Sequence, residues 1–356
     1  MRRHQALFAV SALLVIGACS TAGEETTTSA PTTTATLAPT TTARPTTTRP
    51  PTTTTTKPRP PSPINGLPVE DEALLDRRVI AVKIDNHANA RPQSGIELAN
   101  AIIEVPVEGI TRFIALFHSA DAEYLGPVRS GRPSDGRLLN PLDATMAISG
   151  GQNWVIGTLN GQVEGIIGEV RPAMFRISGR SAPHDLYTNT LLLRDLADER
   201  EYSDIPPPPW FHFAEMPVGA DRASQVVMNF GNGFVVTWTW DPVVKRYQRI
   251  FAGSPANYRD QEGESQPLMA DTLVVIIADR YTEQAPAGQT SVPAMDTTGS
   301  GEAYVFAGGK MSSGTWSRES ADDLIVLSDG GGEPMPVPPG YLWVSIVPTQ
   351  NGITFE

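Results

Sequence analysis

Cysteine is nearly absent from this chain, since Cys19 is the single cysteine among 356 residues. No disulfide can form within the chain after that position, so the folded part must be stable through packing alone. A cysteine nucleophile is excluded from the folded part for the same reason. No apolar stretch after residue 18 approaches the length that a transmembrane helix needs.

Several sequence signatures of enzymes are also missing. The chain has no P-loop, no Gly-x-Gly-x-x-Gly fingerprint, no Gly-x-Ser-x-Gly elbow and no Cys/His spacing typical of a metal site. Positive charge is scarce as well, because residues 64–356 contain 21 Lys and Arg against 37 Asp and Glu. A nucleic-acid partner is therefore not expected, and any anion site must be local.

The N-terminus has the pattern of a secretory signal that ends in a lipidation site. Arg2 and Arg3 precede an apolar run over residues 6–16 that is too short to span a bilayer. Gly-Ala stands before Cys19, as in the bacterial lipobox, where the thiol is diacylated and becomes the new N-terminus. We predict a signal peptide over residues 1–18 and a membrane anchor on Cys19. An ordinary signal peptide with a chance cysteine is the alternative.

Residues 19–63 are predicted to form a disordered tether. After Cys19 they are rich in Thr, Pro and Ala and contain no aromatic residue, so they cannot bury enough apolar surface to offset their ordering entropy. Two acyl chains on Cys19 would give stable membrane anchoring. Together these features predict a protein held at the extracytoplasmic face of a bacterial cell membrane, with its folded part raised from the lipid surface.

Residues 64–204 are predicted to form an α/β domain. Short apolar runs bounded by charged or turn residues predict strands over residues 79–84, 102–107, 111–117 and 145–149. Helices are expected over residues 96–101 (with Ser94 as the cap), from Gln152, and over 190–200.

Residues 205–356 are predicted to form a β-rich domain. Four consecutive prolines at 206–209 break regular structure and mark the boundary. Strands are expected over residues 225–230, 234–240, 243–250, 273–278, 303–307, 324–327 and 341–347. Strands at this spacing, separated by Gly-, Pro- and Asp-rich segments, predict an all-β sandwich or a barrel-like module.

Arginines form the main candidate site. Arg91, Arg112, Arg129 and Arg132 fall at the edges of predicted strands, and Ser130 adds a hydroxyl group within a Gly- and Pro-containing loop. Guanidinium groups bind phosphate and carboxylate groups with two parallel hydrogen bonds, so the pattern favours an anion site.

A second basic edge and a structural alternative accompany these arginines. His184 lies close in sequence to Arg176 and Arg180 and is a further candidate ligand-binding residue. The alternative is that nearby carboxylates neutralise the arginines in structural ion pairs. The acidic residues near in sequence are Glu104, Glu108, Asp121 and Asp135.

Other residue types suggest weaker hypotheses. Asp85 and His87 follow a predicted strand, where they could ligate a metal or simply form a turn. In the second half, tryptophans could line a glycan-binding face or pack in the core, and aromatic core packing is the usual outcome. These tryptophans are Trp238, Trp240, Trp316 and Trp343.

Several blocks of sequence resemble the YerB family, a group of bacterial lipoproteins defined by a domain of unknown function. The matching blocks are AVKIDNH at 81–87, ARPQSG at 90–95, VEGITRF at 107–113, GPVRSGRP at 126–133, APHDLYT at 182–188, YQR at 247–249 and GTW at 314–316. The family pattern differs from this chain at two places. The family has His-Asn where this chain has His184-Asp185, and it has two glycines before the ITRF block where this chain has one. The resemblance implies two domains and a lipid anchor, and it implies no activity.

These observations predict a lipoprotein that binds an anionic cell-envelope ligand or partner through the arginines, with no required cofactor. The alternative is a metal-dependent phosphotransferase or hydrolase acting on a polyprenyl phosphate. The order of Asp85, Arg91 and the Pro-Val-Arg129 turn loosely resembles the LytR-CpsA-Psr phosphotransferases. That resemblance implies that Arg112, Arg129 and Arg132 would neutralise phosphate and that Asp85 would hold Mg²⁺.

Overall fold

The structure of this chain is a computed structural model that describes residues 58–356. The predicted signal peptide, Cys19 and the predicted tether up to residue 57 lie outside the described residues. The last residues of the predicted tether belong to the folded part, since Ser62 is buried and its N–H donates to the Leu67 carbonyl at 2.8 Å. Within residues 58–356, no helix has the length and apolar character needed to cross a membrane.

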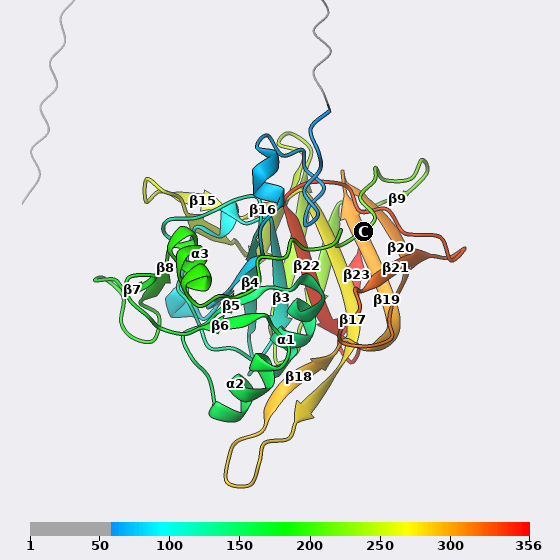
Figure 1. The fold of residues 1–356 in the computed structure, drawn as a ribbon. Coiled ribbons are helices and arrows are strands. Elements are labelled where there is room, and N and C mark those ends of the chain that lie inside the picture. The colour runs from blue at the N-terminus through cyan, green and yellow to red at the C-terminus, as the bar shows by residue number, and fades with distance from the viewer. Residues whose placement is uncertain (1–57) are drawn as a thin grey trace, which may run out of the picture. The chain divides into compact units, whose positions relative to one another are not determined.

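A sheet of twelve strands runs through both halves of the chain (Figure 1). Its main path follows the order β21-β20-β19-β17-β22-β3-β4-β1-β5-β6, with β18 paired to β17 and β9 paired to β20. The strands are β1 (Ile80–Ile84), β3 (Ala101–Pro106), β4 (Thr111–Phe117), β5 (Thr145–Ala147), β6 (Gly165–Ile167), β9 (Asp221–Arg222), β17 (Thr272–Glu283), β18 (Val292–Asp296), β19 (Gly299–Ala307), β20 (Lys310–Arg318), β21 (Val326–Asp329) and β22 (Leu342–Pro348).

The central strands of this sheet are buried on both faces, which explains their almost continuous apolar sequences. Successive side chains of a strand point to opposite faces. Accordingly, Ile80 and Val82 belong to one hydrophobic cluster, and Val79 and Ala81 belong to the other. The sheet therefore separates two cores.

A second sheet of six strands covers one of these cores. Residues of β10 and β11, among them Val226 and Trp238, lie in the same cluster as Ile80 and Trp343. Its strands are β10 (Gln225–Asn229), β11 (Val235–Asp241), β12 (Arg246–Phe251), β13 (Ser254–Pro255), β16 (Met269–Ala270) and β23 (Ile353–Phe355). The two sheets pack in a sandwich-like way, but the larger sheet contains strands of both halves, whereas the predicted sandwich or barrel lay within residues 205–356.

Three α-helices lie in the first half of the chain: α1 (Pro133–Leu139), α2 (Asn153–Asn160) and α3 (Thr190–Glu199). α3 packs against β1 and β6, and α2 packs against β6 and α1. The helices predicted from Gln152 and over 190–200 are confirmed. The Asn189 side chain caps α3 by accepting the N–H groups of Leu191 and Leu192.

The helix predicted over residues 96–101 is wrong. Only a short 3₁₀ turn forms at Ile96–Leu98, and Ser94 lies in a strand instead of capping a helix. Gly95 ends that strand with φ 76°, and Ala101 already starts β3, so no room is left for a helix. The other 3₁₀ turns are η1 (Glu72–Leu75), η2 (Ala88–Ala90) and η4 (Asn140–Leu142).

The α/β first half and the β-rich second half are confirmed, but strands of the second half also pair with strands of the first half. β22 pairs in parallel with β3, with Leu342 opposite Ala101, and in parallel with β17 on its other side. Two smaller sheets complete the fold. They are β2 (Gln93–Ser94) with β14 (Asn257–Arg259) and β15 (Ser265–Pro267), and β7 (Met174–Arg176) with β8 (Leu186–Thr188).

Candidate functional site

Several of the candidate side chains lie where parallel strands end. β1 and β5 pair in parallel, and Asp85 follows the last residue of β1. The loop at residues 129–132 joins this edge, because Arg129 N donates to the Lys83 carbonyl at 2.8 Å and Ser149 N donates to the Arg129 carbonyl at 3.0 Å. In open α/β sheets, ligands usually bind outside the carboxyl ends of the strands.

Asp85 is a fully buried carboxylate at this edge. Its Oδ2 lies 2.7 Å from His184 Nδ1 and 3.3 Å from Arg129 Nε. Its Oδ1 accepts the His87 backbone N–H at 3.0 Å, and the His87 and His184 rings stack with centroids 4.7 Å apart. The buried negative charge is therefore compensated, and the imidazole of His184 is held in one orientation.

His184 lines a cavity of about 730 Å³, which we call the basic cleft. The cleft also contains Arg91, Arg180 and Arg259, and none of the described residues that line it is Asp or Glu. Two short strand pairings form the basic cleft, which takes residues from both halves of the chain. The β7–β8 hairpin carries the loop with Arg180, and parallel pairing of β14 with β2 places Arg259 opposite Ser94.

The three arginines of the basic cleft are held by neutral groups. Arg180 donates to the carbonyls of Asn89 and Pro92 at 2.8 and 2.6 Å, and Arg259 donates to the Gly263 carbonyl at 2.9 Å. Within residues 58–356, none of the three forms an ion pair with a carboxylate. No carboxylate therefore pairs directly with these arginines, although Glu104 and Asp85 lie close enough to Arg91 to interact with its charge.

Arg91 is the most enclosed of the three. It donates to Asn86 at Oδ1 (2.9 Å) and at the backbone carbonyl (2.6 Å), and its guanidinium lies 4.2 Å from the centre of the Phe251 ring. Burial, with a smaller contribution from Arg249, lowers the pKa of Arg91 to about 10. Arg91 therefore stays charged at neutral pH.

The other predicted arginines lie around Asp85. Arg112 Nη1 donates to the Ser130 carbonyl at 3.0 Å, while its buried Nε has no hydrogen-bond partner among the described residues. Burial, followed by the charge of Arg132, lowers the pKa of Arg112 to about 10. The Ser130 Oγ lies 3.5 Å from the Ser149 Oγ. The structure thus brings Arg112, Arg129 and Ser130 together beside Asp85.

The alternative of structural ion pairing applies to part of this set. Arg132 forms a two-pronged pair with Glu108 at 2.7 and 3.0 Å, and Arg176 pairs with Glu169 and Asp185. The other acidic residues that the sequence suggested as partners form ion pairs with basic residues that were not candidate site residues. Those pairs are Glu104 with Arg249, Asp121 with Arg77 and Arg194, and Asp135 with Lys83.

Asp85 as a magnesium ligand stays a prediction. Both of its carboxylate oxygens contact protein groups, one of them the guanidinium of Arg129. In the part of the chain that the structure describes, no group of three or more His, Cys, Asp or Glu residues could hold a metal ion.

The tryptophans belong mainly to the core. Trp238, Trp316 and Trp343 are buried, with the Nε1 of Trp343 donating to Glu104 at 2.9 Å, and Trp240 packs against Tyr247. The exposed aromatic side chain at the basic cleft is Tyr124, which is 43% exposed. Sequence reasoning missed both Tyr124 and Arg259, because each lies outside the arginine-rich blocks.

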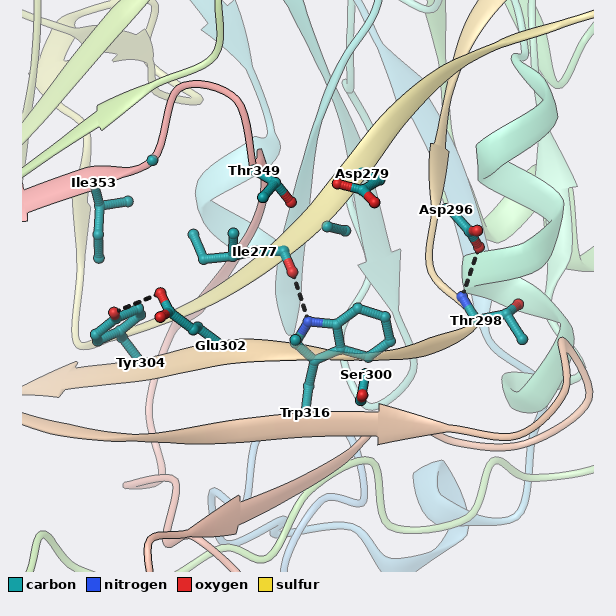
Figure 2. Close-up of a pocket in the computed structure, with 13 residues that line it drawn as sticks. Ile277, Asp279, Asp296, Thr298, Ser300, Glu302, Tyr304, Trp316, Thr349 and Ile353 are labelled. Carbon is teal, nitrogen blue, oxygen red and sulfur yellow. Dashed lines mark hydrogen bonds between the residues drawn. The ribbon is translucent and has the colours of Figure 1, made fainter.

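Another cavity, of about 460 Å³, lies by strands β17, β18 and β19 (Figure 2). It is acidic, with Asp279, Asp296 and Glu302 in its lining. As Figure 2 shows, Tyr304 donates to Glu302 (3.0 Å) and the Thr298 N–H donates to Asp296 (3.1 Å). Its charge opposes the binding of anions, so the basic cleft is the better candidate site.

Comparisons with known proteins agree with the predicted resemblance. Residues 64–203 match the family model described as "Protein of unknown function (DUF3048) N-terminal domain", and residues 226–344 match the model of the corresponding C-terminal domain. The chain is 26% identical over 307 residues to "Putative lipoprotein YerB" of Bacillus subtilis (strain 168), covering 83% of this chain and 88% of that protein.

A solved structure shares the fold. The crystal structure of the YerB protein from Bacillus subtilis superposes with a TM-score of 0.71 at 25% identity, covering 83% of this chain and 99% of that one. The predicted resemblance to YerB is confirmed, and the chain belongs to the DUF3048 family of proteins of unknown function.

Proposed function

We propose that this protein is a lipid-anchored protein of the bacterial cell surface that binds an anionic envelope ligand in the basic cleft. The lipid anchor is supported by the lipobox-like sequence at Cys19 and by the name of the Bacillus relative. The ligand would carry a phosphate or carboxylate group, since guanidinium groups bind both with paired hydrogen bonds. A cofactor is not needed for such binding.

The observation that carries this proposal is the local excess of positive charge. The whole chain has a formal charge of −12, yet the cleft combines Arg91, Arg180 and Arg259 without a lining carboxylate. A cleft lined by one sign of charge concentrates field lines and attracts the opposite sign. Arginines with no binding role would more often be found paired with carboxylates, as Arg132 and Arg176 are.

Calorimetric titration of the purified full chain in detergent with inorganic pyrophosphate tests this function. We expect binding that weakens at least tenfold in Arg180→Ala, about 1.4 kcal/mol. Arg222→Ala is the matched control, because Arg222 is exposed on β9 and does not line the cleft. Binding that is absent in the wild type, or equal in both variants, would contradict the proposal.

A second candidate function is an enzyme acting on a phosphate-bearing envelope substrate, such as a polyprenyl phosphate. It is favoured by the contact between His184 Nδ1 and Asp85, which orients an imidazole at the wall of the cleft, as in proton-transferring pairs. Release of 4-nitrophenol from 4-nitrophenyl phosphate, with and without Mg²⁺, tests it. Turnover that is lost in His184→Asn would favour the enzyme, and a Mg²⁺ requirement would favour the phosphotransferase form.

A further inference from the structure

We propose that the ligand of the basic cleft is an acidic glycan, with its anionic group against the arginines and a sugar ring against Tyr124. This inference rests on the proposed function, because it specifies the ligand of the same site. The proposed ligand carries a polyhydroxylated ring as well as the anionic group, and this ring would occupy a second cavity.

Tyr124 has the placement of a stacking residue. Its ring stacks on Tyr187 with centroids 4.6 Å apart and lies 6.2 Å from the Phe175 ring, yet 43% of Tyr124 stays exposed. Tyr187 is itself buried and packs closely over Gly126. The exposed ring is thus held in place by a buried one, so binding a ligand against it would cost little side-chain entropy.

A second cavity, of about 460 Å³, adjoins the basic cleft at this residue. Both cavities are lined by Ser94, Tyr124 and Arg259, so these residues form the wall between them. The second cavity has the opposite polarity, with Glu97 and Asp260 among its lining residues. A single ligand at this wall would therefore meet cations on one side and acceptors on the other.

Sugar hydroxyls match the acceptors of the second cavity. Glu97 and Asp260 both line this cavity, so their carboxylate groups offer acceptors to the hydroxyls of a ligand. The face of a sugar ring carries C–H groups, which contact an aromatic ring favourably. An anion alone uses neither Tyr124 nor these acceptors, and a purely apolar group would leave the acceptors unpaired.

Titrations of the full chain with three probes test this inference: inorganic phosphate, glucose 1-phosphate and adenosine monophosphate. We expect glucose 1-phosphate to bind about tenfold more tightly than phosphate. Tyr124→Ala should remove this preference, measured as the ratio of the two affinities within the variant, and Tyr124→Phe should keep it, since the phenyl ring still stacks. Unchanged melting temperatures of both variants show that they are folded.

The outcomes separate the two proposals. Equal affinity of the wild type for phosphate and glucose 1-phosphate overturns the glycan while the anion site stands. Tighter binding of adenosine monophosphate than of the sugar phosphate also overturns it, in favour of a nucleotide. If the wild type binds none of the three probes, the proposed anion-binding function fails and the glycan fails with it.

Discussion

His184 Nδ1 lies 2.7 Å from Oδ2 of Asp85, although 99 residues separate them in the chain. The contact joins the end of β1 to the loop between β7 and β8, and the side chain of Asp85 is fully buried. Since Arg129 approaches the same oxygen at 3.3 Å, one carboxylate organises a cation and an imidazole beside the basic cleft.

Asp85→Asn should destabilise the protein. The variant keeps the shape but removes the charge that compensates Arg129, so we expect the free energy of unfolding in urea to fall by about 3 kcal/mol. Asp76→Asn is a matched control on an exposed carboxylate and should change it by less than about 0.5 kcal/mol. Equal effects of the two variants would show that the buried contact has no structural importance.

Arg249→Met should be among the most destabilising substitutions. Arg249 Nη2 lies 2.5 Å from Glu104, which also accepts from Trp343 Nε1, and both charged side chains are buried. Removing one partner leaves a buried charge uncompensated, which costs about 3–5 kcal/mol in unfolding free energy. The double variant with Glu104→Leu should recover part of this loss, and a double variant less stable than Arg249→Met would contradict the argument.

His118 should make the protein sensitive to acid. The His118 side chain is fully buried, and burial, then the charges of Arg194 and Arg77, lowers the pKa of His118 to about 4. The unfolded chain therefore binds a proton first, and stability falls as the pH falls from 6.5 towards 4. At pH 5 the loss is about 2 kcal/mol.

The comparison variant for this effect is His118→Leu. The stability difference between it and the wild type, from urea unfolding at several pH values, should grow below pH 6.5. His212→Leu removes an exposed histidine and should leave the pH profile as it is. A wild-type profile identical to that of His118→Leu would mean that His118 is not buried in its neutral form.

Glu97→Gln should act in the opposite pH direction. Burial raises the pKa of Glu97 to about 7, above its value in the unfolded chain, so ionisation of this residue penalises the folded state as the pH rises from 4.5 through 7. At pH 8 the variant should be more stable than the wild type, because its amide carries no charge. We expect a difference of only about 1 kcal/mol in the free energy of unfolding, because the carboxyl group is only partly buried. Melting temperatures at pH 5 and pH 8 check this, and equal stability at pH 8 would contradict it.

Local patterns predicted many elements of this fold. Apolar runs such as those of β1 and β22 identify buried strands, because a strand covered on both faces needs apolar residues at every position. Helix α3 was predicted over residues 190–200, and strands β3 and β4 were predicted from their apolar runs. The same rules failed at residues 96–101, where a glycine in the left-handed region and the start of β3 overrode the capping pattern.

What the amino-acid sequence alone determined is therefore the local structure, the family and the residue types of the site. Tertiary structure decided which strands share a sheet, because the pairing of β22 with β3 joins residues far apart in the chain. Tertiary structure also decided which arginines form no ion pair with a carboxylate. A pairing such as Arg132 with Glu108 depends on distances between loops, and the addition of Arg259 and Tyr124 to the cleft depends on how those loops pack.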